Sequence, residues 1–166
     1  MSDTIFRNVS QLASADGRML SVLVVPFGQD ITTAGGQRER FEAGAFTRSV
    51  QERGSKIRLF AGEGTARVSV GRAIEWRETP EGLHAVFEVS DSHRGDDVLK
   101  GVREAAWTVG IRPMRERREG DLLIHTEAAL MDVSVGQPQA SAPQVVIPRS
   151  IAQRRLALLL LEREIG

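Results

Sequence analysis

Short apolar segments alternate with turn residues along most of this sequence, and this pattern constrains the fold more than any other feature. In residues 83–89 an apolar side chain recurs at every second position: Leu83, Ala85, Phe87 and Val89. Such alternation is typical of a strand with one buried face. Similar β-rich runs occupy residues 4–9, 19–27, 56–60, 67–76, 107–112 and 122–135. We therefore expect a fold built mainly of strands.

Turn and cap residues mark where these elements join. Asp16-Gly17 predicts a hairpin of residues 4–9 and 19–27, and residues 113–120, rich in Arg and Glu, predict a solvated hairpin loop. Residues 44–53 carry apolar side chains at helical spacing and end at Gly54. A second helix is predicted over residues 95–106, preceded by residues 90–92, which can cap it.

Many strands with a few helices predict an α+β fold that is rich in β structure. Strands in this number usually close into a barrel or a sandwich, because closure hides their edges. We assign residues 1–148 to one β-rich domain and residues 149–166 to a C-terminal amphipathic helix. Between them, residues 138–143 predict a linker and residues 144–147 a last strand.

Composition excludes several classes of function. The formal net charge is zero, so we expect neither a nucleic-acid partner nor binding to an anionic membrane. The chain has no Cys, and its three His have no metal-ligand spacing, so we predict no metal and no cofactor. The longest aliphatic run, residues 156–161, is far shorter than the roughly 20 residues that span a bilayer. No secretory signal is visible in residues 1–10.

Three short motifs follow one another in a set order. They are FEAGAF at residues 41–46, WTVGI at 107–111 and MDVSV at 131–135. A Val-Gly-Arg step at residues 70–72 and a Gly-Leu step at 82–83 lie between the first two. In this order and spacing the motifs resemble the prohead proteases of tailed phages, the serine proteases that trim capsid proteins during head maturation. The resemblance covers roughly residues 20–148.

The resemblance implies a fold and a catalytic site. The fold is assemblin-like, a closed or nearly closed β-barrel with surrounding helices. Carried over position by position, Thr108 stands where the family has its nucleophilic Ser. Asp132 stands at the acidic third member, and Gly62 at the general-base His. No His occurs before His84, so a small slip of the alignment restores none at the Gly62 position.

These departures bear on the chemistry. A hydroxyl is a weak nucleophile until a neighbouring base takes its proton, and in a triad that base is an imidazole. A glycine cannot replace it, and losing a triad member costs about 10⁴ or more in rate. Thr108 keeps the hydroxyl but adds a methyl group that restricts its rotamers. Together the two departures favour a degenerate proteolytic site.

Other residues could substitute for the missing base, and each also has a structural explanation. His84 is the best substitute, with His125 next, although either can be an ordinary strand residue. Glu63 could serve only if burial raised its pKa. We expect Asp132 to be paired, for example with Arg112 or Arg72, or else to take part in the site.

The expected function follows from the resemblance. We expect a head-assembly protein in the host cytoplasm or the phage prohead, with a degenerate site, acting as a structural or scaffold-like partner of the major capsid protein. The alternative is an active endopeptidase that cleaves capsid or scaffold protein with Thr108 as nucleophile. The apolar residues of the C-terminal helix either pack on the barrel or dock to a second copy or a capsid protein, which would make the chain a homo-oligomer or part of a larger assembly.

Overall fold

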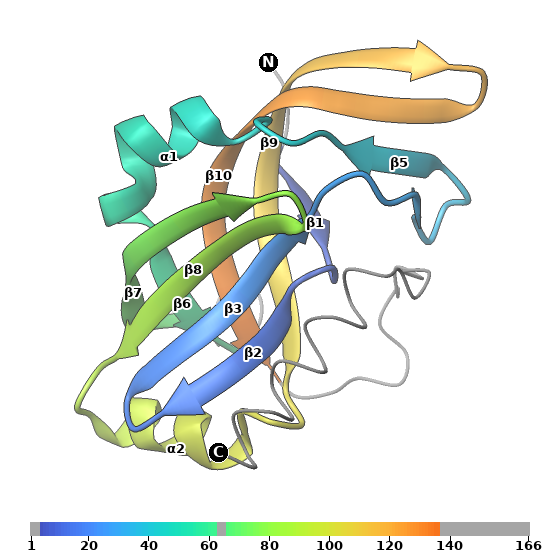
Figure 1. Ribbon diagram of the computed structural model, residues 1–166. Coiled ribbons are helices and arrows are strands. Elements are labelled where there is room, and N and C mark those ends of the chain that lie inside the picture. Colours follow the sequence, from blue (N-terminus) through green and yellow to red (C-terminus); the bar gives the residue numbers. More distant parts are fainter. Residues whose placement is uncertain (1–3, 63–65, 137–166) are drawn as a thin grey trace, which may run out of the picture.

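The computed structural model describes residues 4–62 and 66–136, and Figure 1 shows them as one strongly curled sheet with short helices at its margins. The predicted linker, last strand and C-terminal helix, all within residues 137–166, lie outside the described residues. The strands are β1 (Ile5–Arg7), β2 (Gln11–Asp16), β3 (Met19–Pro26), β4 (Ile31–Thr32), β5 (Arg38–Phe41), β6 (Arg58–Ala61), β7 (Val68–Thr79), β8 (Gly82–Val89), β9 (Ala106–Glu119) and β10 (Leu122–Gly136).

The strands run in the order β1-β9-β10-β6-β7-β8-β3-β2, with β5 pairing beside β10 and β4 beside β5. The α+β, β-rich prediction is confirmed. The prediction of a closed or nearly closed barrel is wrong, because the sheet curls into a half-barrel that stays open (Figure 1). Its two end strands, β1 and β2, pair only with β9 and β3 among the described strands.

The N-terminal hairpin differs from the prediction in its first strand. Gly17 forms the predicted turn, with a φ of 59° that favours glycine. The strand that precedes it is β2, however, and Gln11 pairs with Leu23. Residues 5–7 form β1 at the opposite end of the sheet, where Phe6 lies opposite Gly110. One short run of chain therefore contributes to both ends of the half-barrel.

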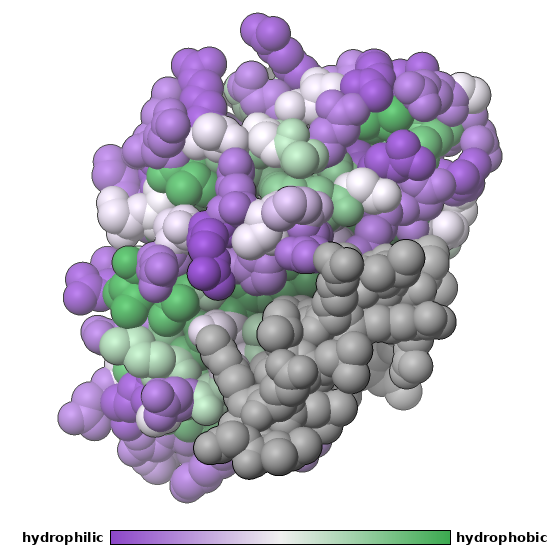
Figure 2. Space-filling model, in the orientation of Figure 1, coloured by the Kyte–Doolittle hydropathy of each residue, from purple (hydrophilic) through white to green (hydrophobic). Residues whose placement is uncertain are grey.

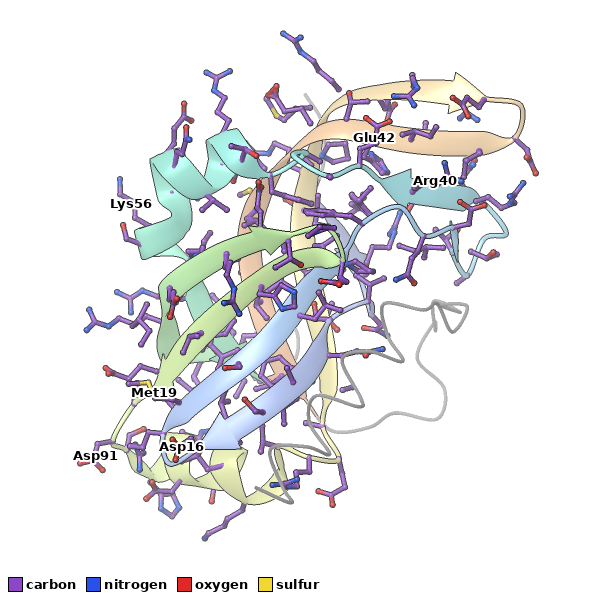
Figure 3. All side chains as sticks on the ribbon, viewed as in Figure 1. Asp16, Met19, Arg40, Glu42, Lys56 and Asp91 are labelled. Carbon is purple, nitrogen blue, oxygen red and sulfur yellow. The ribbon has the colours of Figure 1, made fainter. Side chains whose placement is uncertain are left out.

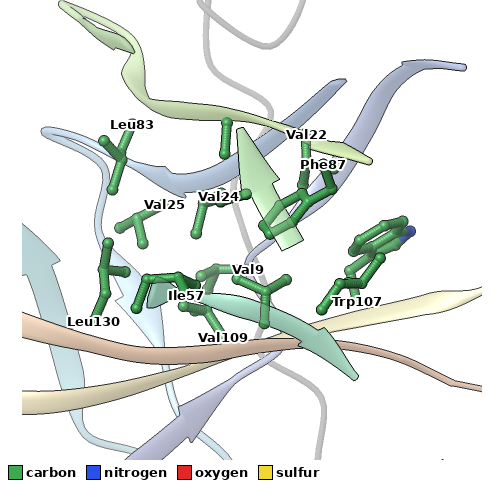
Figure 4. Packing of buried hydrophobic residues seen from close by; sticks show 14 of the residues in the cluster. Val9, Val22, Val24, Val25, Ile57, Leu83, Phe87, Trp107, Val109 and Leu130 are labelled. Carbon is green, nitrogen blue, oxygen red and sulfur yellow. The ribbon is translucent and has the colours of Figure 1, made fainter. Parts of the chain in front are cut away.

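The concave side of the sheet holds the hydrophobic core. Along β9, Trp107, Val109 and Ile111 are buried, and the residues between them face the other side. Ile57, Leu130 and strands β3 and β8 complete the cluster, as Figure 4 shows. The alternation that predicted strands thus divides each of them into a core face and an outer face.

The two helices predicted within the described residues are present and shorter than expected. The first, α1, spans Thr47–Arg53 and continues into a 3₁₀ turn over Gly54–Lys56. Gly54 does not end it in a left-handed conformation, since its φ is −52°. Instead a Cβ at Gly54 would lie 2.9 Å from the Trp76 ring, whose Nε1 donates to the Gly54 carbonyl. The second, α2, spans His93–Gly101, and Ser92 caps it as predicted, accepting from the Gly95 amide at 3.1 Å.

The segment predicted as a solvated loop is a strand. Strand β9 continues through residues 113–119 and pairs with β10, and this hairpin projects from the body of the sheet (Figure 1). The side chains of residues 114–119 on its β9 half are exposed, as expected of the Arg and Glu residues there. Ion pairs tie it to the rest of the molecule: Arg117 contacts Glu42 at 2.6 Å, and Figure 3 shows Glu42 beneath the hairpin. Among the described residues, no helix is long and apolar enough to cross a membrane.

Candidate functional site

Two of the predicted site residues lie on the outer face of neighbouring strands. Thr108 is on β9, between the buried Trp107 side chain and the buried Val109 side chain, and Asp132 is on β10, directly before the buried Val133. The register places Thr108 opposite Ser134 and Asp132 opposite Gly110. Thr108 and Asp132 are therefore diagonal neighbours on one surface, although they are 24 residues apart in sequence.

The Thr108 hydroxyl is held by an amide side chain. It donates a hydrogen bond to Asn8 Oδ1, and Asn8 directly follows β1. Strand β1 pairs with β9 through Ile111, Gly110 and Val109, which brings Asn8 beside Thr108. A carboxamide oxygen accepts a hydrogen bond but does not take up a proton at neutral pH. The partner of this hydroxyl is thus no general base.

The Asp132 carboxylate is paired, as expected, but with a different arginine. Its Oδ2 lies 3.2 Å from Arg67 Nη2, and the two side chains are 17% and 25% exposed. The Arg67 guanidinium also stacks 4.3 Å from the centre of the Phe60 ring. The predicted partners lie elsewhere: Arg72 pairs with Glu88, at 3.8 Å, and Arg112 is exposed.

Gly110 leaves room for this carboxylate. A Cβ at Gly110 would lie 3.0 Å from Asp132 Oδ1 and 3.2 Å from the Phe6 ring, closer than most real Cβ contacts. Asp132 Oδ1 is buried and has no hydrogen-bond partner among the described residues. A glycine is needed here because the Asp132 and Phe6 side chains pack against this position on the outer face.

The backbone at Gly62 excludes a side chain. Its φ is 92°, a conformation that non-glycine residues rarely adopt. A Cβ there would also lie 2.9 Å from the Ala66 carbonyl oxygen. A histidine at this position would therefore require the loop after β6 to change its path.

His84 lies away from Thr108. It is on the outer face of β8, and three strands, β10, β6 and β7, stand between β8 and β9. At about 4.8 Å per strand this is roughly 19 Å around the sheet. The His84 Nε2 contacts the Thr79 hydroxyl at 3.1 Å. Burial, with the nearby Arg77 charge, lowers the pKa of His84, which keeps the ring neutral at pH 7.

His125 belongs to a separate buried cluster near the projecting hairpin. The ring is 1% exposed and stacks on Phe41 at 4.6 Å. Its Nε2 lies 3.5 Å from Glu39 Oε1, and its Nδ1 lies 3.7 Å from Glu116. His125 precedes Ser134 by nine residues along β10, roughly 30 Å of strand at about 3.3 Å per residue.

The remaining imidazole, His93, is 91% exposed at the start of α2 and lies 3.9 Å from Asp97. The structure therefore brings Thr108 and Asp132 onto one surface and brings no histidine to them. The sequence reasoning missed Asn8 and Arg67, which make the direct contacts. No local signal identifies them, because Asn8 reaches Thr108 through pairing across 100 residues. Among the described residues, no three His, Asp or Glu side chains cluster as a metal site requires.

Comparison with known proteins finds a likeness in structure. The fold is similar to that of the bacteriophage T4 capsid assembly protease gp21, with a TM-score of 0.58 and 10% sequence identity. The match covers 82% of this chain and 98% of that chain. No family model and no curated protein matches the sequence. At this identity the likeness shows a prohead protease-like fold, which agrees with the motifs at residues 41–46, 107–111 and 131–135 at the level of the fold.

Proposed function

We propose that this chain is a phage head-assembly protein that retains a protease fold without its reaction. In this role it acts in the host cytoplasm or the prohead as a structural or scaffold-like partner of the major capsid protein. The similarity to a capsid assembly protease supports the assembly role. Glu63, the carboxylate considered as a base, lies outside the described residues; among the residues that the structure does describe, which include all three histidines, no base lies beside Thr108, and this supports the loss of cleavage.

One observation carries the proposal: the Thr108 hydroxyl donates to Asn8 Oδ1 and has no imidazole within reach. All three histidines of the chain are described, and each lies in another part of the fold. Proton removal from an alcohol is the step that a serine-type protease must catalyse. Here the alcohol is instead a donor in a structural hydrogen bond between β1 and β9.

The surroundings of Asp132 point the same way. In a triad the carboxylate accepts from an imidazole N–H and thereby orients the ring. In this chain its nearest charged partner is Arg67, at 3.2 Å, and the Phe60 ring backs that guanidinium. The outer face of β6 beside Ser134 therefore carries a cation–aromatic pair. The Asp132 carboxylate is therefore engaged by a cation and has no imidazole to orient.

The second candidate is an active endopeptidase with Thr108 as nucleophile and a base supplied from elsewhere. This candidate is supported by the position of Thr108 and the partly buried Asp132 on the same outer face of β9 and β10. An incubation of the purified chain with the capsid and scaffold proteins of the same phage separates the two candidates. We expect co-assembly, measured by co-sedimentation, with no cleavage product by mass spectrometry.

Two variants make the assay specific. Thr108→Ala removes the proposed nucleophile, and Ser134→Ala removes the hydroxyl opposite it in the register. A product that disappears in Thr108→Ala and persists in Ser134→Ala would establish the endopeptidase. Failure to associate with any head protein, again without cleavage, would instead indicate a binding module unrelated to capsids and would overturn both candidates.

A further inference from the structure

The open side of the half-barrel has two free strand edges that face the same gap. One is the edge of β2 away from β3, since β2 has no second partner among residues 4–62 and 66–136. The other is the start of β9: β1 pairs only with residues 109–111, so among the described strands residues 106–108 are paired on the β10 side alone. The link from Asn8 to Ser10 connects β1, which pairs with β9, to β2. Ser10 Oγ donates to the Val24 carbonyl at 2.6 Å, and this hydrogen bond attaches the link to β3. The gap between β2 and β9 therefore begins at this link and extends toward α2, as Figure 1 shows.

Strand β2 has a bulge between Leu12 and Ser14 but lacks the side chains that usually protect an edge strand. Its sequence, QLASAD, contains no Lys, no Pro and one charged residue, at its end. Edge strands that stay free are commonly protected by such residues, because unpaired backbone groups recruit other strands. Leu12 and Ala15 on β2 are only partly buried, and so is Ala105 beside β9, although all three pack against the core. Trp107 Nε1 is buried there without a hydrogen-bond partner among the described residues.

Apolar side chains are exposed on this face of the molecule. Figure 2 shows hydrophobic residues across the left and middle of the face and a smaller hydrophobic group beside the projecting hairpin, with hydrophilic residues along the outer margins. A strand added to β2 would cover part of this apolar surface and pair the free backbone groups at the same time.

We infer that residues 144–147 of this same chain pair with the free edge of β2. Their sequence, QVVI, has three β-branched residues in a row, a composition that favours a strand and that is a liability when left unpaired. Strand β10 ends at Gly136, which lies opposite Ala106 at the wide end of the gap. Strand β10 runs toward that end and β2 runs toward it as well, so a returning segment is antiparallel to β2.

The connecting segment is long enough for this path. Residues 137–143 number seven, and an extended chain spans at most about 3.3–3.6 Å per residue, or roughly 23 Å in total. Passing the end of β9 from β10 takes about two strand spacings, roughly 10 Å, which leaves about 13 Å of the extended connector to reach toward β2. Pro138 and Pro143 fit a connector, because neither supplies an amide to a sheet. This inference does not depend on the proposed function.

Hydrogen exchange of the full-length chain tests the pairing. In the unmodified protein we expect the β2 amides that point away from β3 to be protected. Val146→Pro removes an amide from the added strand and should increase their exchange more than tenfold. Ala140→Pro, in the connector that already contains two prolines, is the matched control and should leave them unchanged. Equal exchange of the β2 amides in all three proteins would overturn the inference.

Cross-linking identifies which chain supplies the strand. The protein has no Cys, so Ser14→Cys on β2 can be combined in turn with Val145→Cys and Val146→Cys, which point to opposite faces of a strand. We expect one of the pairs to form a disulfide within a monomer under mild oxidation. A disulfide that links two chains would assign the edge to a second copy, and the absence of any disulfide would leave β2 unpaired. Either result would refute pairing within the chain.

Discussion

Glu39 offers the sharpest physical test of the structure. Its side chain is 4% exposed on β5 and accepts two hydrogen bonds from Arg7, from Nε at 2.9 Å and from Nη2 at 2.8 Å. His125 Nε2 lies 3.5 Å from the same carboxylate. Because Arg7 belongs to β1, this carboxylate ties the end strand beside Thr108 to the middle of the molecule. The variant Glu39→Gln keeps the shape of the side chain and removes its charge.

The size of the effect follows from the pKa of Glu39. Burial raises that pKa, but the two hydrogen bonds and the charge of Arg7, with the His125 ring nearby, outweigh burial and hold it at about 2, against an ordinary value of 4.5. A difference of about 2.5 units at 1.36 kcal/mol each corresponds to about 3 kcal/mol of stability at neutral pH. Glutamine resembles the protonated acid, so we expect Glu39→Gln to lower the free energy of unfolding by about that amount.

The pH dependence has a definite sign. The folded state lowers the pKa of Glu39, so its contribution to stability is complete above pH 4.5 and is lost as the pH falls toward 2. The stability difference between the unmodified protein and Glu39→Gln should therefore be constant from pH 7 to about pH 5.5. By pH 3 it should shrink by about 2 kcal/mol, because Glu39 is then neutral in the unfolded chain.

Urea denaturation at a series of pH values measures this difference. Other carboxylates titrate in the same range, but they are present in both proteins and cancel in the subtraction. Glu52→Gln is the control: Glu52 pairs with Arg48 on the surface of α1, and such exposed pairs contribute little to stability. A stability difference for Glu39→Gln that stays the same between pH 6 and pH 3 would show that the Arg7–Glu39 pair does not exist as described.

Two further substitutions test how the helices attach to the sheet. Ser49→Ala removes the hydroxyl that accepts from the Leu130 amide at 2.8 Å, so it leaves a buried N–H unpaired. We expect it to lower the free energy of unfolding by about 1–3 kcal/mol, measured by thermal or urea denaturation. Ser49→Thr keeps a hydroxyl and should retain most of the stability. Gly95→Ala would place a Cβ 2.1 Å from the Ser90 carbonyl and should destabilise the protein by at least about 1 kcal/mol. Gly101→Ala, in open space on the same helix, should instead be neutral or stabilising, and equal losses for the two alanines would contradict the packing at the start of α2.

The projecting hairpin shows why one element could not be predicted. Residues 113–120 are charged and include Pro113, and by local chemistry they belong in a loop. They form a strand because β10 continues alongside them and supplies backbone partners as far as Glu119. Pairing between strands is a property of two segments together, so the composition of one of them does not reveal it.

The candidate catalytic residues also were predicted in part from the sequence and in part only from the structure. The motifs place Thr108 and Asp132 on neighbouring strands, and the structure places them on one face. The roles of Thr108, Asp132 and His84 in catalysis stay predictions, and cleavage assays of the kind described above test them. Arg67, rather than Arg112 or Arg72, pairs with Asp132, because the curl of the sheet decides which arginine reaches the carboxylate.

By itself the sequence determined most of the longer strands, the positions of two helices and the core-facing residues of strands such as β8, because alternation and capping are local and each segment carries its own pattern. Only the tertiary structure decided that the half-barrel stays open, that Asn8 accepts from Thr108, and that each histidine lies away from that hydroxyl. These depend on the order in which distant strands pair, and pairing order is fixed by the burial of the whole sheet rather than by any one segment.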